Sequence, residues 1–228
     1  MAEAEIAGVE AVVFDAYGTL FDVASAATAC RDVLGERAAP LAALWRDKQL
    51  QYTWLRAVAG RHADFWQVTG DALDFALAAL GLEGAVPRER LLGLYRTLDA
   101  FPDAPEALRR IKAAGLPTAI LSNGSPAMLQ SAVAPAGIAQ LLDLVLSVEE
   151  VGVFKPHPKV YQLAVDRLGV RAAAILFVSS NGWDAAAAAA FGMRALWCNR
   201  YRQPPERLPG RPEREIHSLA ELPPLVGG

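Results

Sequence analysis

The spacing of apolar residues divides the chain into three parts. Four apolar residues at positions 11–14 run directly into Asp15 and a glycine-containing turn, which is the pattern of a buried strand that ends at a turn. Between positions 23 and 100 the apolar residues recur at helical spacing, with little strand character. From position 101 onward, short apolar runs alternate with amphipathic segments. The pattern predicts one strand, a block of helices and then an alternating α/β region.

The helical block interrupts an alternation of strands and helices. A row of helices with no strand between them does not fit a repeating strand–helix–strand unit, but it fits an inserted helical subdomain. We therefore expect a core domain formed by 1–22 and 101–228, and an inserted helical cap over 23–100. The helices of the cap are expected over 40–58, ending before Gly60, and over 63–80 and 87–98.

The alternating region predicts an α/β fold. Strands and helices that follow one another in this way form a parallel sheet covered by helices on both faces, in a doubly wound, Rossmann-like arrangement. A Pro- and Arg-rich segment over 203–214 is expected to form a surface loop before a last short element. The strands are expected at 11–14, 116–122, 142–146, 174–179 and 194–198, and the helices at 104–114, 126–136, 158–168 and 185–190.

Composition narrows the functional classes. With 53% hydrophobic and 21% charged residues, the chain of 228 residues can build a large core. The formal charge of −3 and the dispersed Lys and Arg residues argue against a nucleic-acid partner. Cys30 and Cys198 are far apart in the sequence and form no disulfide framework. Since neither a signal peptide nor a bilayer-spanning run is found, we expect a cytoplasmic protein without a membrane partner.

Polar side chains gather where the predicted strands end. Asp15 follows the first strand, and Ser122 and Asn123 end the second. Open parallel sheets bring the carboxyl ends of their strands to one crevice, so these groups are expected to converge. Taken singly, such residues are more often turn or cap residues, and only their joint placement favours a site. The later members are Lys155 and Tyr161, between the third and fourth strands, and Ser179, Asn181 and Asp184, which follow the fourth strand and precede the alanine-rich helix.

Four short motifs carry most of these residues. They are Asp15-x-Tyr17-Gly-Thr19-Leu, Ser122-Asn123-Gly, Lys155-Pro156 and Ser179-Ser180-Asn181-x-x-Asp184. Together they resemble the motifs of the haloacid dehalogenase superfamily. More narrowly, segments 14–23, 45–54, 120–126 and 175–181 are similar to the L-2-haloacid dehalogenases, and the likeness covers almost the whole chain. The resemblance implies a HAD-like fold and the hydrolysis of short L-2-haloalkanoic acids to D-2-hydroxy acids.

Tyr17 separates two kinds of chemistry within this superfamily. Its phosphatases carry a second aspartate two residues after the nucleophile, where it acts as general acid/base beside Mg²⁺. A tyrosine supplies no carboxylate for this work, and its ring suits an apolar substrate wall. We therefore expect attack on carbon rather than on phosphorus, with no metal and no other cofactor, although Asp15 and Asp184 are able to hold Mg²⁺.

The resemblance makes Asp15 the nucleophile. A carboxylate that attacks a saturated carbon needs desolvation and alignment but loses no proton. Asp15 would displace halide from C2 with inversion, and water would then hydrolyse the ester. Lys155 is expected to keep Asp15 ionised, because two unit charges ~4 Å apart gain ~4 kcal/mol at an effective dielectric of ~20. Asp184, at the positive end of the alanine-rich helix, is expected to position the water, helped by Asn181 and Ser179.

The remaining candidates bind the substrate and the halide. Thr19 and Ser122 are donors suited to the second oxygen of the nucleophile or to the substrate carboxylate, and Tyr161 is expected to orient Lys155 or the site water. A lone arginine on a helix is usually solvated. The resemblance nevertheless places Arg46 over the leaving halide, with Asn123 as second donor. The apolar walls are expected from Tyr17, Leu50, Phe65 and Trp183.

Other functions stay open from the sequence. They are a magnesium-dependent phosphatase of the same fold, a hydrolase that attacks another activated C2 carbon such as that of a small cyclic imino acid, and a catalytically silent binding module. The expected partners are a 2-haloalkanoate and a halide ion, and related enzymes imply a homodimer. His62, His157 and His217 show no metal-ligand spacing and receive no role.

Overall fold

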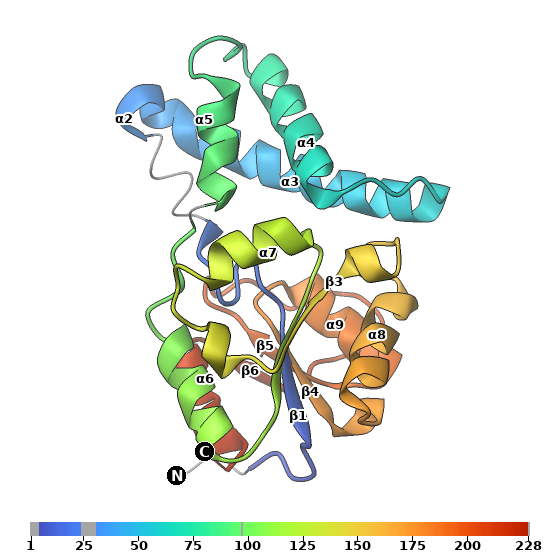
Figure 1. The fold of residues 1–228 in the computed structure, drawn as a ribbon. Coiled ribbons are helices and arrows are strands. Elements are labelled where there is room, and N and C mark those ends of the chain that lie inside the picture. The colour runs from blue at the N-terminus through green and yellow to red at the C-terminus, as the bar shows by residue number, and fades with distance from the viewer. Residues whose placement is uncertain (1–4, 24–30, 97, 228) are drawn as a thin grey trace.

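A single parallel sheet forms the centre of the molecule (Figure 1). The computed structural model describes residues 5–23, 31–96 and 98–227, so Cys30 lies outside the described part. In this part, six strands lie in the order β3-β2-β1-β4-β5-β6, with β1 between β2 and β4. These three strands are buried along their whole length, as their apolar runs predicted. The strands are β1 (Ala11–Phe14), β2 (Thr118–Ser122), β3 (Leu144–Ser147), β4 (Ile175–Ser179), β5 (Arg194–Cys198) and β6 (Arg214–Ile216).

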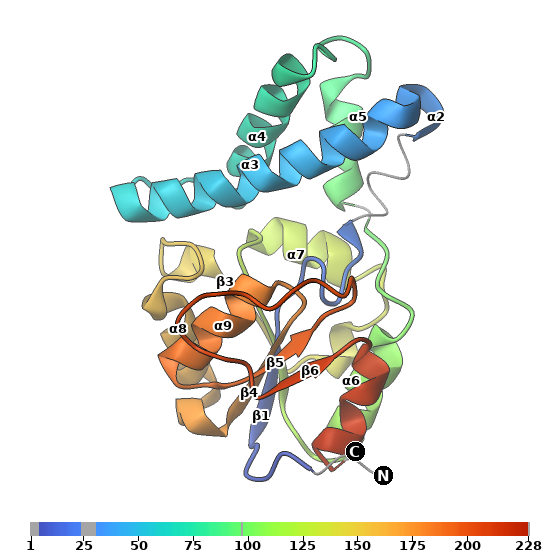
Figure 2. The same ribbon diagram turned by 180° about the vertical axis from the view of Figure 1, so that it is seen from behind.

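The order of the strands determines where a ligand can bind. The chain runs outward from β1 through β2 to β3, and then returns to the other side of β1 at β4. In open α/β sheets, the crevice for ligands lies outside the carboxyl ends of the strands at this reversal. Helix α7 (Pro126–Val133) lies in front of the sheet in Figure 1, and α9 (Gly182–Phe191) lies in front of it in the opposite view of Figure 2. The predicted doubly wound fold is therefore confirmed. The other two helices of the sheet region are α6 (Ala104–Ala113) and α8 (Pro158–Leu168).

A layer of helices, here called the helical layer (residues 31–96), lies beyond the carboxyl end of β1 (Figure 1). Its long helices, α3 (Ala38–Ala59) and α4 (Phe65–Ala79), pack against each other and confirm two predicted helices. Gly60 ends α3 in the left-handed conformation at φ 62°, and the Asp64 side chain caps α4 by accepting from the Trp66 N–H at 2.6 Å. The short elements are α2 (Arg31–Leu34), η1 (Gly35–Arg37), α5 (Arg88–Gly93) and η2 (Leu94–Arg96).

Most predicted boundaries shift by one to three residues in the structure, and three elements differ in a way that matters. The helix expected over 87–98 changes to a 3-10 turn after Gly93. Helix α9 begins at Gly182 rather than at the first alanine, so Asp184 lies inside its first turn and not before the helix. The loop over 203–214 leads into β6, a strand that the pattern did not identify because it is short and only partly buried. The loop passes so close to α9 that position 210 needs glycine, since a Cβ on Gly210 would lie 2.2 Å from the Ala186 carbonyl oxygen.

The two chain segments that join the helical layer to the sheet run side by side. The Asp22 N–H donates to the Asp99 carbonyl at 2.9 Å, and the Phe101 N–H donates to the Leu20 carbonyl at 2.8 Å. Both crossings therefore lie at one place, directly after the turn that follows Asp15. None of the described helices is both long enough and apolar enough to span a membrane.

Candidate active site

Strand ends and one loop bring the candidate side chains together. Asp15 directly follows β1, Ser122 ends β2 and Ser179 ends β4. Lys155 comes from the loop before α8, and Asp184 comes from the first turn of α9. All of these elements flank the reversal of strand order between β1 and β4. The structure thus gathers the groups that the sequence placed at strand ends.

The Lys155 ammonium lies between two carboxylates. Its Nζ is 3.1 Å from Asp15 Oδ1 and 2.7 Å from Asp184 Oδ2, and all three residues are buried. Burial would lower the pKa of Lys155, but the charges of Asp15 and Asp184 outweigh it and raise that pKa. Burial raises the pKa of Asp184, while Lys155 and the Tyr161 hydroxyl, which donates at 2.7 Å, stabilise its ionised form. The lysine therefore stays charged and gives Asp15 a counter-charge.

Neutral donors hold the other oxygen of Asp15. Asn181 Nδ2 donates to Oδ2 at 2.8 Å, Thr19 Oγ1 at 3.2 Å, and Ser179 Oγ at a long 3.5 Å. Thr19 Oγ1 accepts from the Ser180 N–H at 2.8 Å, which turns its own proton toward Asp15. Both carboxylate oxygens are therefore oriented in advance of any ligand.

Ser122 and Asn123 border the same site. Ser122 Oγ accepts from the Gly124 N–H at 3.1 Å, and Asn123 Oδ1 accepts from the Lys155 backbone N–H at 3.0 Å. Since the oxygen of the Asn123 amide is committed to the Lys155 backbone, its NH₂ group is the end that can donate to a ligand. This orientation suits the binding of an anion.

Arg46 reaches the site from α3. Its Nη1 donates to Gln49 Oε1 at 2.7 Å, and its Nη2 donates to Asn181 Oδ1 at 3.4 Å. A guanidinium has five N–H donors, so further donors remain for an anion. Because Asn181 also donates to Asp15, the guanidinium is held close to the Asp15 carboxylate. The helical layer therefore contributes a positive charge to a site that is otherwise built on the sheet.

A small cavity separates the helical layer from the strand ends. Its volume is about 20 Å³, room for roughly one water molecule. Four of the predicted site residues do not border this cavity but lie behind Asp15 and Lys155. Thr19 and Ser179 contact Asp15, Asp184 contacts Lys155, and Tyr161 contacts Asp184. The cavity is lined by Asp15, Tyr17, Arg46, Leu50, Phe65, Ser122, Asn123, Lys155, Asn181 and Trp183.

Tyr17 forms part of the apolar wall. Its ring centroid is 6.2 Å from that of Phe65, and burial raises the pKa of its hydroxyl above the usual value, so the side chain is neutral. Gly124 passes close to the ring: a Cβ at this position would lie 2.7 Å from Tyr17 Cε2. The sequence placed Gly124 in a motif but gave no reason for it. The reason is the space that Tyr17 occupies.

Two further residues were missed by the sequence analysis. Gln49 is fully buried in α3 and contacts Arg46. Its position four residues after Trp45 puts a polar side chain on the apolar face of the helix, and this was the available signal. Arg200 follows the end of β5 and donates to the Thr19 carbonyl at 3.0 Å. The rule that polar groups collect at strand ends would also have indicated Arg200.

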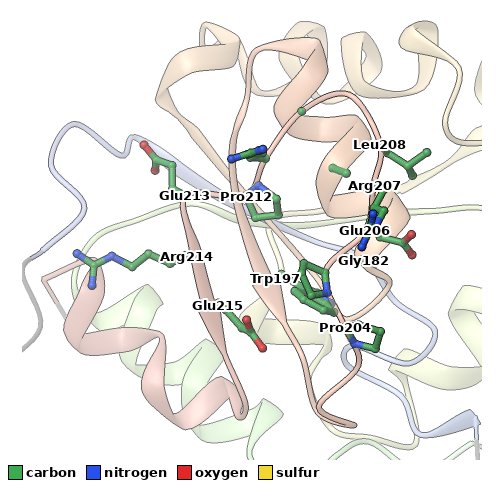
Figure 3. A pocket seen from close by; sticks show the side chains of 14 residues that line it. Gly182, Trp197, Pro204, Glu206, Arg207, Leu208, Pro212, Glu213, Arg214 and Glu215 are labelled. Carbon is green, nitrogen blue, oxygen red and sulfur yellow. The ribbon is translucent and has the colours of Figure 1, made fainter.

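A larger cavity lies elsewhere (Figure 3). Its volume is about 790 Å³, and it lies beside α9, β5 and the loop over 203–214, with Trp197, Glu206 and Arg207 among its lining. Oppositely charged side chains alternate along this loop, and none of the candidate residues borders the cavity. Chemistry rather than volume therefore locates the candidate site. Across the described residues, no group of three or more His, Cys, Asp or Glu side chains is arranged to bind a metal ion.

Known proteins are similar to this chain in sequence. A family model described as haloacid dehalogenase-like hydrolase matches residues 9–192. The (S)-2-haloacid dehalogenase 1 of Pseudomonas sp. (strain CBS-3) is 47% identical over 219 residues, which are 96% of each chain. The (S)-2-haloacid dehalogenase of Xanthobacter autotrophicus is 50% identical over 86% of this chain and 77% of its own.

Solved structures share the fold and the arrangement of the whole chain. The L-2-haloacid dehalogenase from Xanthobacter autotrophicus with chloropropionic acid covalently bound has a TM-score of 0.89 at 40% identity, covering 96% of this chain and 99% of its own. A dehalogenase with intermediate complex has a TM-score of 0.93 at 42% identity, covering 97% and 98%. The site geometry, the family model and these near full-length relatives agree, and the chain belongs to the haloacid dehalogenase-like hydrolases and, within them, to the (S)-2-haloacid dehalogenases.

Proposed function

We propose that the chain hydrolyses short (S)-2-haloalkanoic acids to 2-hydroxy acids of inverted configuration, through an ester on Asp15. The observation that carries this proposal is the placement of the Asp15 carboxylate. One of its oxygens faces the Lys155 ammonium and the other accepts from Asn181, at the edge of a cavity with one apolar wall. Such a carboxylate has a counter-charge, is aligned and is largely desolvated, which are the needs of a nucleophile that attacks a saturated carbon.

In the first step an Asp15 oxygen forms a bond to C2 from the side opposite the halogen. The C2–halogen bond breaks, and the halide leaves with the electron pair. Arg46 and the Asn123 NH₂ group border the cavity and would stabilise the negative charge that develops on the halide. Tyr17, Leu50, Phe65 and Trp183 would enclose the alkyl part of the substrate. Backside attack inverts C2.

In the second step water attacks the ester carbonyl carbon of Asp15. Asp184 accepts one proton of this water, directly or through Lys155, and the bond between the carbonyl carbon and the substrate oxygen breaks. The departing alkoxide takes this proton back from Asp184 and becomes the hydroxyl of the product, and the second proton of the water leaves to solvent as the Asp15 carboxylate is regenerated. Ester formation has removed the charge of Asp15, so Lys155 is then paired with Asp184 alone. Tyr161, a donor to Asp184, and Ser179, a donor to Asp15, would keep both carboxyl groups in place. The product retains an oxygen atom that belonged to Asp15.

We propose that this chemistry needs no metal. The position that a superfamily phosphatase uses for its second aspartate holds Tyr17, which burial keeps neutral. The Lys155 ammonium lies between Asp15 and Asp184, and its charge opposes the binding of Mg²⁺ by this pair. Of these two features, Tyr17 is the one that also disfavours a phosphatase reaction, because Lys155 belongs to a motif of the whole superfamily.

The direct test is halide release from (S)-2-chloropropionate in the presence of EDTA, beside hydrolysis of a generic phosphate ester with Mg²⁺. We expect metal-independent chloride release from the (S) substrate and none from its (R) enantiomer. Phosphate release that requires Mg²⁺, without chloride release, would overturn the proposal.

Oxygen labelling tests the ester. When enzyme exceeds substrate in ¹⁸O-labelled water, the first product should carry unlabelled oxygen from Asp15, and the label should be found in the Asp15 carboxylate. Asp15→Asn should fold and show no turnover. Labelled product in the first turnover would instead indicate direct attack of water on C2.

We also propose how the chain is organised beyond this site. Residues 1–22 and 101–228 would form the core domain and residues 23–100 an inserted cap, a division supported by the helical layer beyond the sheet (Figure 1). Exposed Val33 and Leu55 on the helical layer support a homodimer, which light scattering in solution tests. The free, buried thiol of Cys198 is typical of a reducing compartment and supports a cytoplasmic location, tested by cell fractionation.

A further inference from the structure

One amide in the helical layer is fully buried and hydrogen-bonded at both ends. Gln49, on α3, donates from Nε2 to Thr69 Oγ1 on α4 at 2.7 Å. The Thr69 hydroxyl donates its only proton to the Phe65 carbonyl at 2.7 Å. Thr69 can therefore only accept from Gln49, and this determines which end of the amide faces which partner. The Gln49 oxygen must face away from Thr69.

That oxygen faces Arg46. The distance from Arg46 Nη1 to Gln49 Oε1 is 2.7 Å, within the range of a charge-assisted hydrogen bond. On its other side, Arg46 Nη2 donates to Asn181 Oδ1 at 3.4 Å, and Asn181 donates to Asp15 at 2.8 Å. A chain of hydrogen bonds therefore runs from the nucleophile through Arg46 and Gln49 to the helix that carries Phe65.

Burying the Gln49 amide costs free energy, and packing between the helices gives no reason for an amide at this position. Trp45 and Leu41, one and two turns earlier on α3, are buried apolar residues, and an apolar side chain at position 49 would continue this face. Burying an amide between two helices is unfavourable unless its hydrogen bonds are made. Arginine has many rotamers, and a fixed acceptor removes most of them. The presence of the Gln49 amide is explained if the direction of the Arg46 guanidinium matters for the reaction.

We propose that Gln49 is a positioning residue that aims Arg46 at the departing halide, and that it thereby sets how strongly the rate depends on the halogen. The inference rests on the proposed dehalogenase function. Chloride leaves carbon less readily than bromide and concentrates its charge in a smaller volume, so its departure depends more on a well-aimed guanidinium. Removing the Gln49 acceptor should slow chloride release more than bromide release.

The experiment compares wild type with Gln49→Met, which keeps length and removes the acceptor. Halide release is measured in a single turnover with enzyme in excess, from (S)-2-chloropropionate and (S)-2-bromopropionate, so that ester hydrolysis and product release do not mask the step. The loss of one hydrogen bond to a charged group should slow chloride release by about 10- to 100-fold and bromide release by several-fold less. Inhibition by added chloride should weaken in parallel.

Thr53→Val is the matched control. Thr53 is buried in the same helix one turn later, and its hydroxyl donates only to the Leu50 carbonyl of its own helix. This variant should keep the wild-type ratio of chloride to bromide rates. Thr69→Val removes the partner that orients the Gln49 amide and should shift the ratio in the same direction as Gln49→Met, by a smaller factor, even if Gln49→Met fails to fold.

The outcomes separate this inference from the function on which it rests. If wild type releases no halide, the proposed function fails. If wild type releases halide but Gln49→Met and Thr69→Val lower the melting temperature without changing the ratio of the two rates, Gln49 is only a packing residue and the inference is overturned.

Discussion

At the scale of single residues, the charge of Lys155 serves two carboxylates at once. Its ammonium contacts Asp15 at 3.1 Å and Asp184 at 2.7 Å while all three side chains are buried. Two buried carboxylates close to one another cannot both ionise without a counter-charge, because like charges raise each other's pKa. An ammonium is a compact charge with three donors, and it can contact two acceptors that lie in different directions.

The variant Lys155→Met tests this role. Without the ammonium, one carboxylate of the Asp15–Asp184 pair should take up a proton, and kcat should fall by at least about 10³-fold at neutral pH. The pKa of that carboxylate is raised, so the residual rate should increase as pH rises through the new pKa. The measurement is kcat for (S)-2-chloropropionate against pH.

Lys112→Met is the control for this variant, since Lys112 forms an exposed ion pair with Asp143. It should keep the wild-type rate and pH profile. A Lys155→Met enzyme with a wild-type rate at neutral pH would show that the site ionises without the lysine.

At the scale of elements, a half-buried ion pair between Arg200 and Asp103 holds together the two segments that connect the helical layer to the sheet. Arg200, after β5, donates to both oxygens of Asp103 at 2.9 Å and to the Thr19 carbonyl at 3.0 Å. Ser218 Oγ and the Leu219 N–H also donate hydrogen bonds to the Asp103 carboxylate, at 2.7 Å and 2.9 Å. The end of one strand thus holds the loop after Asp15 and the start of α6 together.

Asp103→Asn is expected to destabilise the fold. Burial tends to raise the pKa of Asp103, but hydrogen bonds from Arg200 and Ser218 outweigh it and hold that pKa below its usual range. The carboxylate therefore contributes stability above the unfolded pKa of about 3.9, and this contribution is lost as pH falls through the lower folded pKa. Urea unfolding should show a loss of about 2–4 kcal/mol at neutral pH that shrinks at acidic pH.

The exposed Asp74 offers a matched substitution. Its ion pair with Arg88 lies at the surface, so Asp74→Asn should cost less than about 1 kcal/mol at any pH. Equal losses of unfolding free energy in Asp103→Asn and Asp74→Asn would show that the Arg200–Asp103 pair stabilises the fold no more than a surface ion pair does.

The elements also show how much of the fold and of the candidate site could be predicted from the sequence alone. The strand ends carrying Asp15, Ser122 and Ser179 followed from apolar runs, because a buried strand and its stop are local features. Arg46 was placed by family resemblance, since the helical pattern alone indicated a solvated side chain. Gln49 and Arg200 were missed because their partners are far away in the sequence: Thr69 lies on another helix, and Asp103 precedes α6. The order of the strands depends likewise on long-range pairing.

At the scale of the whole molecule, the site is closed. The cavity of about 20 Å³ is too small for chloropropionate, and the helical layer contacts the sheet region around it. His62 Nε2 and Glu149 Oε2 are in hydrogen-bond contact at 2.9 Å across this boundary, and Trp54 meets Trp183 edge to face with ring centroids 5.5 Å apart. We therefore predict that substrate enters when the helical layer moves relative to the strand ends.

A removable tether tests this movement. Val58 on α3 and Leu208 on the loop over 203–214 are both exposed and line one apolar groove of about 560 Å³, so a short thiol-reactive linker can join cysteines placed at the two positions. In Val58→Cys/Leu208→Cys, closing the linker should reduce kcat/KM by at least about tenfold, because binding waits for opening, and cleaving its disulfides should restore the rate. Each single variant treated with the linker should keep its rate. The tether leaves Asp15, Lys155 and Arg46 untouched. A loss of kcat/KM that is confined to the joined form would therefore identify the motion of the helical layer as the step that admits substrate. A full rate in the joined form would mean that side-chain rearrangement suffices.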